Sequence, residues 1–147
     1  MTKFQILKEY EVNLMNIMNL LGSGITDNIQ LDKLGSLLFE KQYLGTFSSD
    51  QFPKYIKNEK CFIMNNKTSK QKGEHFIAFF KRDNKLYGYD SFNRPVKKLA
   101  SKYWWNKHIV NANKDKDQSY EESNCGSRCM SFLISFSKWG TQVINII

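Results

Sequence analysis

The sequence is poor in cysteine and histidine, and these shortages exclude two classes of protein. Three cysteines in 147 residues are too few, and odd in number, for a disulfide framework. They fit a reducing compartment and at least one free thiol. Two histidines, and no two cysteines separated by two residues, leave no spacing typical of a zinc site. We therefore expect a protein that needs no metal cofactor.

Long apolar runs are also missing. Polar residues interrupt every apolar stretch, which argues against a membrane-spanning helix. Glu9 and Glu11 stand where a secretory leader would carry its apolar core, so no leader peptide is expected. The hydrophobic fraction of 41% and the aromatic fraction of 14% are nevertheless sufficient for a packed core. The length predicts one domain over residues 1–147.

Acidic residues are fewer than basic residues, 14 against 22, and the net charge is +8. The basic residues are scattered and form no dense run. One interpretation is a solvated, lysine-rich surface. The other is a polyanionic partner, most often nucleic acid. The composition leaves both interpretations open.

Helix patterns occupy the first part of the chain. Apolar residues at steps of three and four predict an amphipathic helix over residues 3–21, within an extra N-terminal helical segment 1–24. The apolar side of this helix is expected to carry Phe4, Leu7, Leu14, Ile17, Met18 and Leu21. Asp27 is a suitable cap for a second helix. The buried side of that helix is expected to carry Ile29, Leu31, Leu34, Leu37 and Leu38. Residues 43–56 are expected to be irregular, because they combine a glycine, a Ser-Ser-Asp turn and a proline.

Strand patterns follow in the centre of the chain. Residues 61–65 form a short apolar run, and residues 75–82 and 85–92 read as two strands joined by the tight turn Arg-Asp-Asn-Lys. A helix is then expected over residues 95–105, a strand over 108–113 and a last helix over 124–139. The predicted fold class is α+β, with a central, mostly antiparallel sheet flanked by helices.

The start of the last predicted helix carries the first candidate for chemistry. A thiol at Cys125 would meet the positive end of the helix dipole and free N–H groups, which favour thiolate. Gly126 would let a ligand backbone approach closely. With a turn at residues 82–84, His75 and Asp90 are almost equally far from it and would face each other on neighbouring strands. The acid could then fix the histidine tautomer, as in a nucleophilic triad.

Gln118 completes the candidate set, since an amide N–H is a suitable donor to an oxyanion formed beside the nucleophile. Each residue also has a structural interpretation. A cysteine on an apolar helix face commonly fills a core, a histidine on a strand is often structural, and Asp-Ser-Phe is a common turn. The joint order of the four residues and the hairpin register strengthen the functional interpretation, and both interpretations stay open at this point.

Four segments together resemble the adenovirus maturation proteases, the adenain family, whose wider clan includes the SUMO-specific proteases. The segments are YLGTFSSDQFPKYI, CFIMNNKTSKQKGEHFIAFF, LYGYDSF and QSYEESNCGSRCMSFL, within residues 43–137. The shared order is a Leu-Gly-Thr-aromatic run ending in Phe-Pro and an apolar strand ending in Asn. A Gly-x-His, an acid-x-Phe, a Gln and a Cys-Gly follow.

The resemblance implies a papain-like, adenain-like fold with the nucleophile at a helix N-terminus. It implies an endopeptidase in which His75 is the base, Asp90 the orienting acid and Cys125 the nucleophile, with an oxyanion hole at Gln118 and the Cys125 N–H. Expected substrate contacts are Phe76, Asn124 and Gly126, and the ring of Phe76 is expected to flank the imidazole, where the family usually has Trp. Expected substrates are viral precursor capsid and core proteins, cut after Gly-Gly or Gly-x during virion maturation. The expected location is the virion and the viral assembly site inside the host cell.

The sequence departs from the family in its acid, Asp in place of the Glu of adenain, and in its cysteines. No cysteine lies between Cys61 and Cys125, so a disulfide-tethered peptide activator is not expected. Activation by DNA or by a peptide held without a disulfide stays open. The expected partners are viral precursor polypeptides and non-specifically bound DNA, with no membrane.

Two alternatives stand beside this function. The first is a protease of ubiquitin-like conjugates, from the same clan. The short chain and the Leu-Gly-Thr-Phe run favour the viral substrate instead. The second is a basic DNA-binding virion protein on a degenerate protease fold. The presence of all three of His75, Asp90 and Cys125 argues against degeneration.

Overall fold

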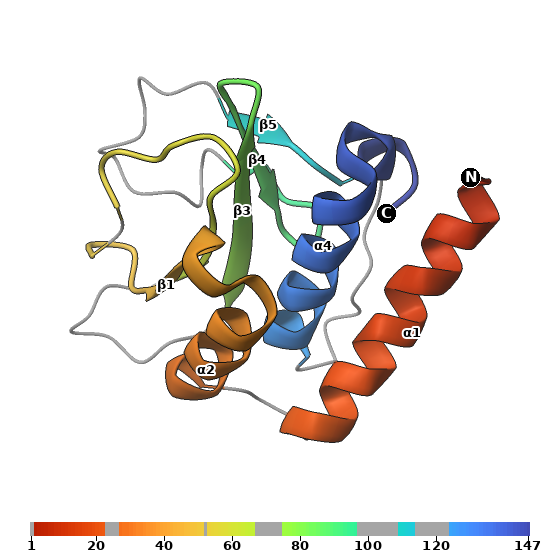
Figure 1. The fold of residues 1–147 in the computed structure, drawn as a ribbon, viewed down its shortest axis with the longest axis horizontal. Helices are drawn as coiled ribbons and strands as arrows, with labels where there is room; N and C mark the ends of the chain where they lie inside the picture. Colours follow the sequence, from red (N-terminus) through yellow and green to blue (C-terminus); the bar gives the residue numbers. More distant parts are fainter. Residues whose placement is uncertain (1, 23–26, 52, 67–74, 97–108, 114–123) are drawn as a thin grey trace.

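The computed structural model describes residues 2–22, 27–51, 53–66, 75–96, 109–113 and 124–147 (Figure 1). These residues form three α-helices and a mixed five-stranded sheet, so the α+β class is confirmed. In chain order the elements are α1 (Lys3–Leu21), α2 (Asn28–Phe39), the 3₁₀ turn η1 (Glu40–Gln42), β1 (Tyr43–Phe47), β2 (Cys61–Asn65), β3 (Phe76–Arg82), β4 (Lys85–Tyr89), β5 (Ile109–Asn111), α4 (Cys125–Trp139) and the 3₁₀ segment η3 (Gly140–Asn145).

The sheet has the order β1-β2-β3-β4-β5 and is mixed. Its inner pairs, β2–β3 and β3–β4, are antiparallel, whereas the outer pairs, β1–β2 and β4–β5, are parallel. The prediction of a mostly antiparallel sheet is therefore wrong for the outer strands. The physical reason is connection length. More than ten residues separate the two strands of each parallel pair, which is long enough for a crossover.

Strand β1 also corrects the prediction that residues 43–56 are irregular. Tyr43 is buried and pairs with Cys61, while the rest of the strand is half-buried or exposed. Gly45 adopts φ +140°, and the register shifts between Tyr43 and Thr46. A strand with this irregularity has no alternating apolar pattern, so its sequence resembles a loop.

The β3–β4 hairpin forms as predicted. Asp83 and Asn84 both have positive φ, 52° and 62°, as a two-residue turn of the primed type requires. The register runs from Arg82↔Lys85 to Ala78↔Tyr89. His75 directly precedes β3 and Asp90 directly follows β4, so both lie at the sheet end away from the turn. When this register is extended by one residue, Asp90 lies opposite Ile77, two positions after His75. The two are therefore diagonal neighbours and not directly opposite as predicted.

Helix α4 runs along β3 in the same direction (Figure 1). At one end Cys125 lies beside Phe76, whose backbone N–H helps to lower the pKa of the thiol. At the other end Arg82 Nη1 donates to the Phe136 carbonyl at 3.1 Å. Between these points Phe132 stacks on Tyr89, with ring centroids 4.6 Å apart. The helix is buried along nearly its whole length, so the packing fixes where its N-terminus lies relative to the sheet.

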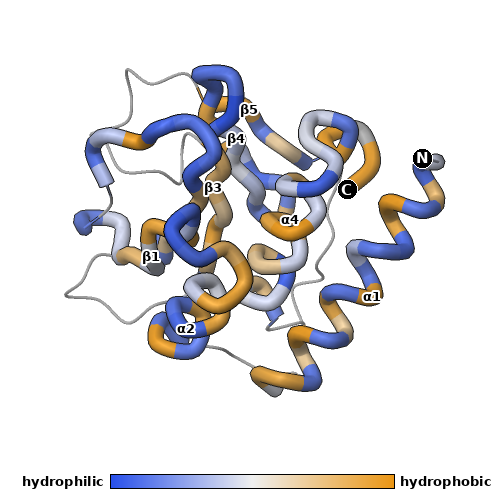
Figure 2. The backbone as a smooth tube through the Cα atoms, viewed as in Figure 1, coloured by the Kyte–Doolittle hydropathy of each residue, from blue (hydrophilic) through white to orange (hydrophobic). Residues whose placement is uncertain are grey.

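Helix α1 packs against α4 and alternates between hydrophobic and hydrophilic residues (Figure 2). Its first turn is capped by Thr2. Its buried residues are Ile6, Tyr10, Leu14 and Ile17. The Tyr10 hydroxyl meets that of Tyr89 at 2.6 Å, and Ser131 Oγ donates to the Tyr10 carbonyl at 2.7 Å. The predicted N-terminal helix is confirmed, although Phe4, expected on its apolar side, is 72% exposed.

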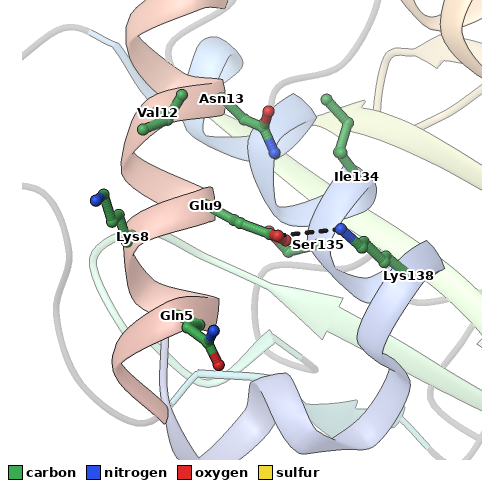
Figure 3. A pocket seen from close by; sticks show the side chains of 8 residues that line it. All are labelled: Gln5, Lys8, Glu9, Val12, Asn13, Ile134, Ser135 and Lys138. Carbon is green, nitrogen blue, oxygen red and sulfur yellow. Dashed lines mark hydrogen bonds and ion pairs between the residues drawn. The ribbon is translucent and has the colours of Figure 1, made fainter. Parts of the chain in front are cut away.

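A shallow groove of about 570 Å³ lies along the outer side of the α1–α4 contact (Figure 3). The Glu9–Lys138 ion pair, at 3.0 Å, crosses it, and the second oxygen of Glu9 accepts a hydrogen bond from Trp139 Nε1 at 2.8 Å. These contacts attach the first half of α1 to the last turn of α4. They add polar links at the rim of the contact between the two helices.

Helix α2 begins at the predicted cap, where Gln30 N donates to Asp27 Oδ1 at 2.8 Å. Its buried face is narrower than predicted. Leu31 and Leu34 are buried, but Ile29, Leu37 and Leu38 are exposed. The helix carries apolar residues on several sides and packs mainly on β1, so periodicity alone could not select the buried side.

Two predicted elements, the strand over residues 108–113 and the helix over residues 95–105, extend beyond the described residues. Strand β5 confirms the strand expected over residues 108–113, with shorter bounds. The helix expected over residues 95–105 lies almost entirely outside the described residues. Within the part of the chain that is described, no helix is long and apolar enough to cross a lipid bilayer.

Candidate active site

Three of the predicted site residues meet at one end of the sheet. His75 Nε2 forms a hydrogen bond and ion pair with Asp90 Oδ1. The Cys125 thiol lies beside the same imidazole ring, close enough for each group to shift the pKa of the other. Because Nε2 faces the carboxylate, Nδ1 is the ring nitrogen left for the sulfur. All three residues are buried, and Cys125 is the most exposed of them at 9%.

Cys125 is the first residue of α4. The cap residue Asn124 makes no side-chain capping bond, and the first turn contains no acidic residue. A thiolate would therefore be the negative charge that complements the helix dipole. Burial alone would raise the pKa of Cys125. Hydrogen bonds from His75, the His75 charge and the backbone N–H groups of Phe76 and Gly126 outweigh burial and lower that pKa.

The pKa values of the other two thiols, Cys61 and Cys129, shift upward instead. Burial raises the pKa of Cys61 to about 12. Burial also raises the pKa of Cys129, one turn after Cys125, well above its ordinary value. Both side chains are completely buried in the main core, as expected for structural cysteines. The chain thus contains one thiol whose surroundings favour the thiolate and two whose surroundings oppose it.

The pKa of His75 is raised, whereas that of Cys125 is lowered. Burial would lower it, but the hydrogen bonds with Asp90 and Cys125 and the charges of both groups raise it overall. A lowered thiol pKa beside a raised imidazole pKa favours a thiolate–imidazolium pair at intermediate pH. Such a pair is the reactive form of a cysteine nucleophile.

The Asp90 carboxylate accepts hydrogen bonds at both oxygens. Oδ1 faces His75 and lies 3.4 Å from the Phe92 N–H. Oδ2 accepts from the Arg94 N–H at 3.0 Å and from Arg94 Nε at 2.9 Å. Burial would raise the pKa of Asp90, but the bonds with His75 and Arg94 and their charges lower it to about 2. The carboxylate is therefore ionised over the whole neutral range.

Two residues of this cluster were not predicted as site residues. The Phe92 ring stacks on the His75 ring, with centroids 4.9 Å apart at 27°. The resemblance had assigned this flanking position to Phe76, whose side chain belongs to the main core. The acid-x-Phe spacing was the available signal for Phe92. Arg94 had no signal, because the loop that folds it back onto Asp90 has no regular pattern.

Three further predicted site residues are Gln118, Asn124 and Gly126. Gln118 lies outside the described residues. The Asn124 amide oxygen accepts from Arg128 Nε at 3.1 Å, and its nitrogen lies 3.7 Å from the Met18 sulfur. This side chain therefore links α4 to α1, and its expected contact with substrate stays a prediction. Gly126 is buried in the first turn of α4, directly after the thiol.

Buried polar atoms without a hydrogen-bond partner gather around this cluster. In the described part of the chain they include Asn66 Oδ1 and Asn113 Nδ2. The Asn66 N–H donates to the His75 carbonyl at 2.9 Å, and Asn113 Oδ1 accepts from the Asp90 N–H at 3.0 Å. Arg94 Nη2 and Ser127 Oγ also belong to this set. Proteins pair nearly all such groups, so their concentration here is typical of a functional site.

Among the described residues, no group of three or more His, Cys, Asp or Glu side chains could hold a metal ion. The expectation that the protein needs no metal cofactor stays a prediction.

No protein-family model matches the chain, and comparison with the curated proteins finds no match. The resemblance to the adenain family thus rests on the motifs alone. The chemistry of the site is interpreted from its own geometry.

Proposed function

We propose that this chain is a cysteine endopeptidase of the adenovirus maturation type. The observation that carries the proposal is the grouping of Cys125, His75 and Asp90 at the N-terminus of α4, where His75 is hydrogen-bonded to Asp90 and lies beside the Cys125 thiol. It supplies an activated thiol, a base that shares its proton, and an ionised acid that holds the base. These are the parts that nucleophilic acyl transfer requires.

In the first half of the reaction, the Cys125 thiolate attacks the scissile carbonyl carbon and a carbon–sulfur bond forms. The carbonyl π electrons move to oxygen. When the carbon–nitrogen bond breaks, the imidazolium of His75 gives its proton to the leaving amine. In the second half, His75 removes a proton from water as the water attacks the thioester. The carbon–sulfur bond then breaks with its electron pair returning to sulfur, the acid product leaves, and Cys125 and His75 are again thiolate and imidazolium.

The negative oxygen formed in each half needs donors. The N-terminal N–H groups of α4 have no partner within the helix, which makes the Cys125 N–H suitable. We propose Gln118 as the second donor, from its spacing and the resemblance. A Gln118→Ala variant should then lose about 100-fold to 1,000-fold in kcat, with KM little changed.

The family resemblance suggests the substrate. We propose viral precursor capsid and core proteins, cut after Gly-Gly or Gly-x in the assembling virion. Gly126 and Phe76 would border the substrate backbone. Proteolysis of ubiquitin-like conjugates is the alternative, because the same chemistry serves both. Cleavage of a short Gly-Gly peptide with no turnover of a folded ubiquitin-like conjugate would favour the viral substrate.

The test of the nucleophile uses a Gly-Gly-derived peptide electrophile. Wild-type protein should acquire one covalent label, detected by intact mass, and Cys125→Ala should acquire none. Cys129→Ala is a matched control, because it removes a thiol one turn further along the same helix and should still be labelled. Equal labelling of wild type and Cys125→Ala would overturn the nucleophile assignment.

Non-specific DNA binding is a second proposed property, supported by the net charge of +8. The protease would then reach substrates along packaged DNA. Such binding should weaken by orders of magnitude between low and physiological salt. If duplex DNA changes neither electrophoretic mobility nor peptide cleavage at low salt, this second property is excluded.

A further inference from the structure

We propose that Arg94 is a positioning residue of this site: it holds one oxygen of Asp90 so that the other stays directed at His75, and its charge balances the site. The inference rests on the proposed cysteine-protease function. Its principal measurement, the ionisation of Cys125, does not require turnover.

The geometry ties Arg94 to Asp90 twice. The backbone N–H and side-chain Nε of Arg94 both reach Oδ2, at 3.0 and 2.9 Å. Asn93, at φ +57°, donates its N–H to the Asp90 carbonyl at 2.8 Å and turns the chain back. The side-chain carboxyl group of Asp90 is completely buried, whereas the side chain of Arg94 is 40% exposed. With Oδ2 occupied in this way, rotation of the carboxylate away from His75 would break two hydrogen bonds to Arg94.

A second contact runs through Phe92. The guanidinium carbon of Arg94 lies 5.2 Å from the centre of the Phe92 ring. The Phe92 ring in turn stacks on the His75 imidazole. Arg94 thus supports the carboxylate that bonds the imidazole and also the ring that flanks it.

The charge balance around Asp90 depends on Arg94. The titratable and charged groups around Asp90 in the described residues are His75 from the start of β3, Arg94 from the loop after β4, and Cys129 from α4, with Cys125 beyond His75. Cys129 is neutral because burial raises its pKa. In the reactive form Asp90 and Cys125 are negative and His75 is positive, and Arg94 supplies the second positive charge that pairs directly with Asp90. The buried Arg128 of α4 is also positive, but its side chain donates to Asn124 and Tyr10. Without Arg94 the buried Asp90 carboxylate would keep His75 as its one ion-pair partner in the described residues, which makes its charge more costly to bury.

Removal of this positive charge should raise the pKa of every group that feels it. In Arg94→Met, thiolate formation at Cys125, followed by ultraviolet absorbance, should shift to higher pH by about half a unit or more. The acid and alkaline limits of kcat/KM should shift in the same direction. The plateau value should fall through kcat, with KM little changed. Arg94→Gln is a second neutral variant for use if the Met variant does not fold.

Two further variants separate positioning from general stability. Arg94→Lys keeps the charge, so it should restore the pH limits while leaving the plateau reduced. Arg82→Met removes an arginine–carboxylate pair at the far end of β3 and should leave both pH limits unchanged. The proposal is overturned if Arg94→Met and Arg94→Gln titrate like wild type, or if Arg82→Met shifts the limits equally. Absence of peptide cleavage by wild type would instead overturn the proposed function, and the thiol titration would still test Arg94.

Discussion

Cys61, Cys125 and Cys129 have the same side chain but lie in two kinds of electrostatic environment. Cys61 and Cys129 are completely buried, and burial raises the pKa of each thiol. Cys125 is nearly as buried, but it stands at a helix N-terminus beside His75, and its pKa is lowered. At the residue scale, reactivity is therefore a property of the surroundings.

Iodoacetamide should modify Cys125 at neutral pH at least about ten times faster than either other thiol, because the thiolate is the reactive form. Peptide mass mapping over time measures the three rates. His75→Ala should slow modification of Cys125, because it removes the hydrogen bond and charge that favour the thiolate. A faster reaction at Cys61 or Cys129 in folded protein would contradict the assignment.

The pKa of Asp90, lowered from 3.8 to about 2, has a consequence for acid stability. A carboxyl group with a lowered folded-state pKa stabilises the fold above its unfolded pKa, and this stabilisation is lost as pH falls through the folded pKa. The contribution should be about 2 kcal/mol at neutral pH and disappear between about pH 4 and about pH 2. His75 is protonated in both states throughout this window, so its contribution to stability does not change with pH there.

Asp90→Asn checks this prediction in denaturant titrations at several pH values. The free energy of unfolding of wild type should fall faster than that of the variant as pH decreases from about 4 to about 2. Parallel curves over this window would show that the carboxylate is not held in its ionised form by the fold.

At the scale of elements, Arg82 connects β3 to the C-terminal end of α4. Its guanidinium donates to both carboxylate oxygens of Glu59, at 2.7 and 2.8 Å, and to the carbonyls of Phe136 and Ser137. It also lies over the Phe136 ring, 5.4 Å from the centre. This contact attaches the last turns of α4 to the sheet, at the end of the helix away from Cys125.

Arg82→Met should destabilise the fold by about 2 kcal/mol, because it removes donors from two carbonyls at the end of α4 and leaves the Glu59 carboxylate without its arginine partner. Glu59→Gln should cost less than about 1 kcal/mol, because the carboxylate is 47% exposed and can be solvated. Urea denaturation measures both. Equal losses would mean that the ion pair, and not the bonds to α4, carries the stabilisation.

At the scale of the whole molecule, α1 is the outer cover of α4. Its four buried side chains contribute roughly 1.5–3 kcal/mol each by the usual transfer values. Their sum is comparable with the total stability of a small domain. Tyr10 extends this cover to the sheet through its hydroxyl contact with Tyr89. Loss of α1 would expose the α4 face that lies directly behind the site.

Deletion of residues 1–22 should therefore abolish cooperative thermal unfolding, followed by circular dichroism, and lower solubility. Phe4→Ser is a matched control, because Phe4 belongs to α1 but is 72% exposed, and its melting temperature should match wild type. A truncated chain that is soluble, equally stable and equally active would refute the covering role of α1.

The sequence by itself was sufficient for features whose causes are local. The 3- and 4-residue apolar spacing predicted α1 and α4, the Asp27 cap predicted the start of α2, and the Asp83–Asn84 turn predicted the β3–β4 hairpin. Because that turn sets the register, it also predicted that His75 and Asp90 lie at the same end of the sheet. Cys125 could be predicted at a helix start because the apolar spacing of α4 is itself a local pattern.

Only the tertiary structure decided the features that depend on distant partners. β1 forms because β2 pairs with it, and its own sequence resembles a loop. The exposed apolar residues of α2 were assigned to a core because periodicity does not show which side a neighbour covers. Arg94 reaches Asp90 through an irregular turn, and the thiol pKa depends on segments brought together by the fold. Hydrogen bonding, burial and charge act between groups that are close in space, so their combined effect on a residue is fixed only when the chain is folded.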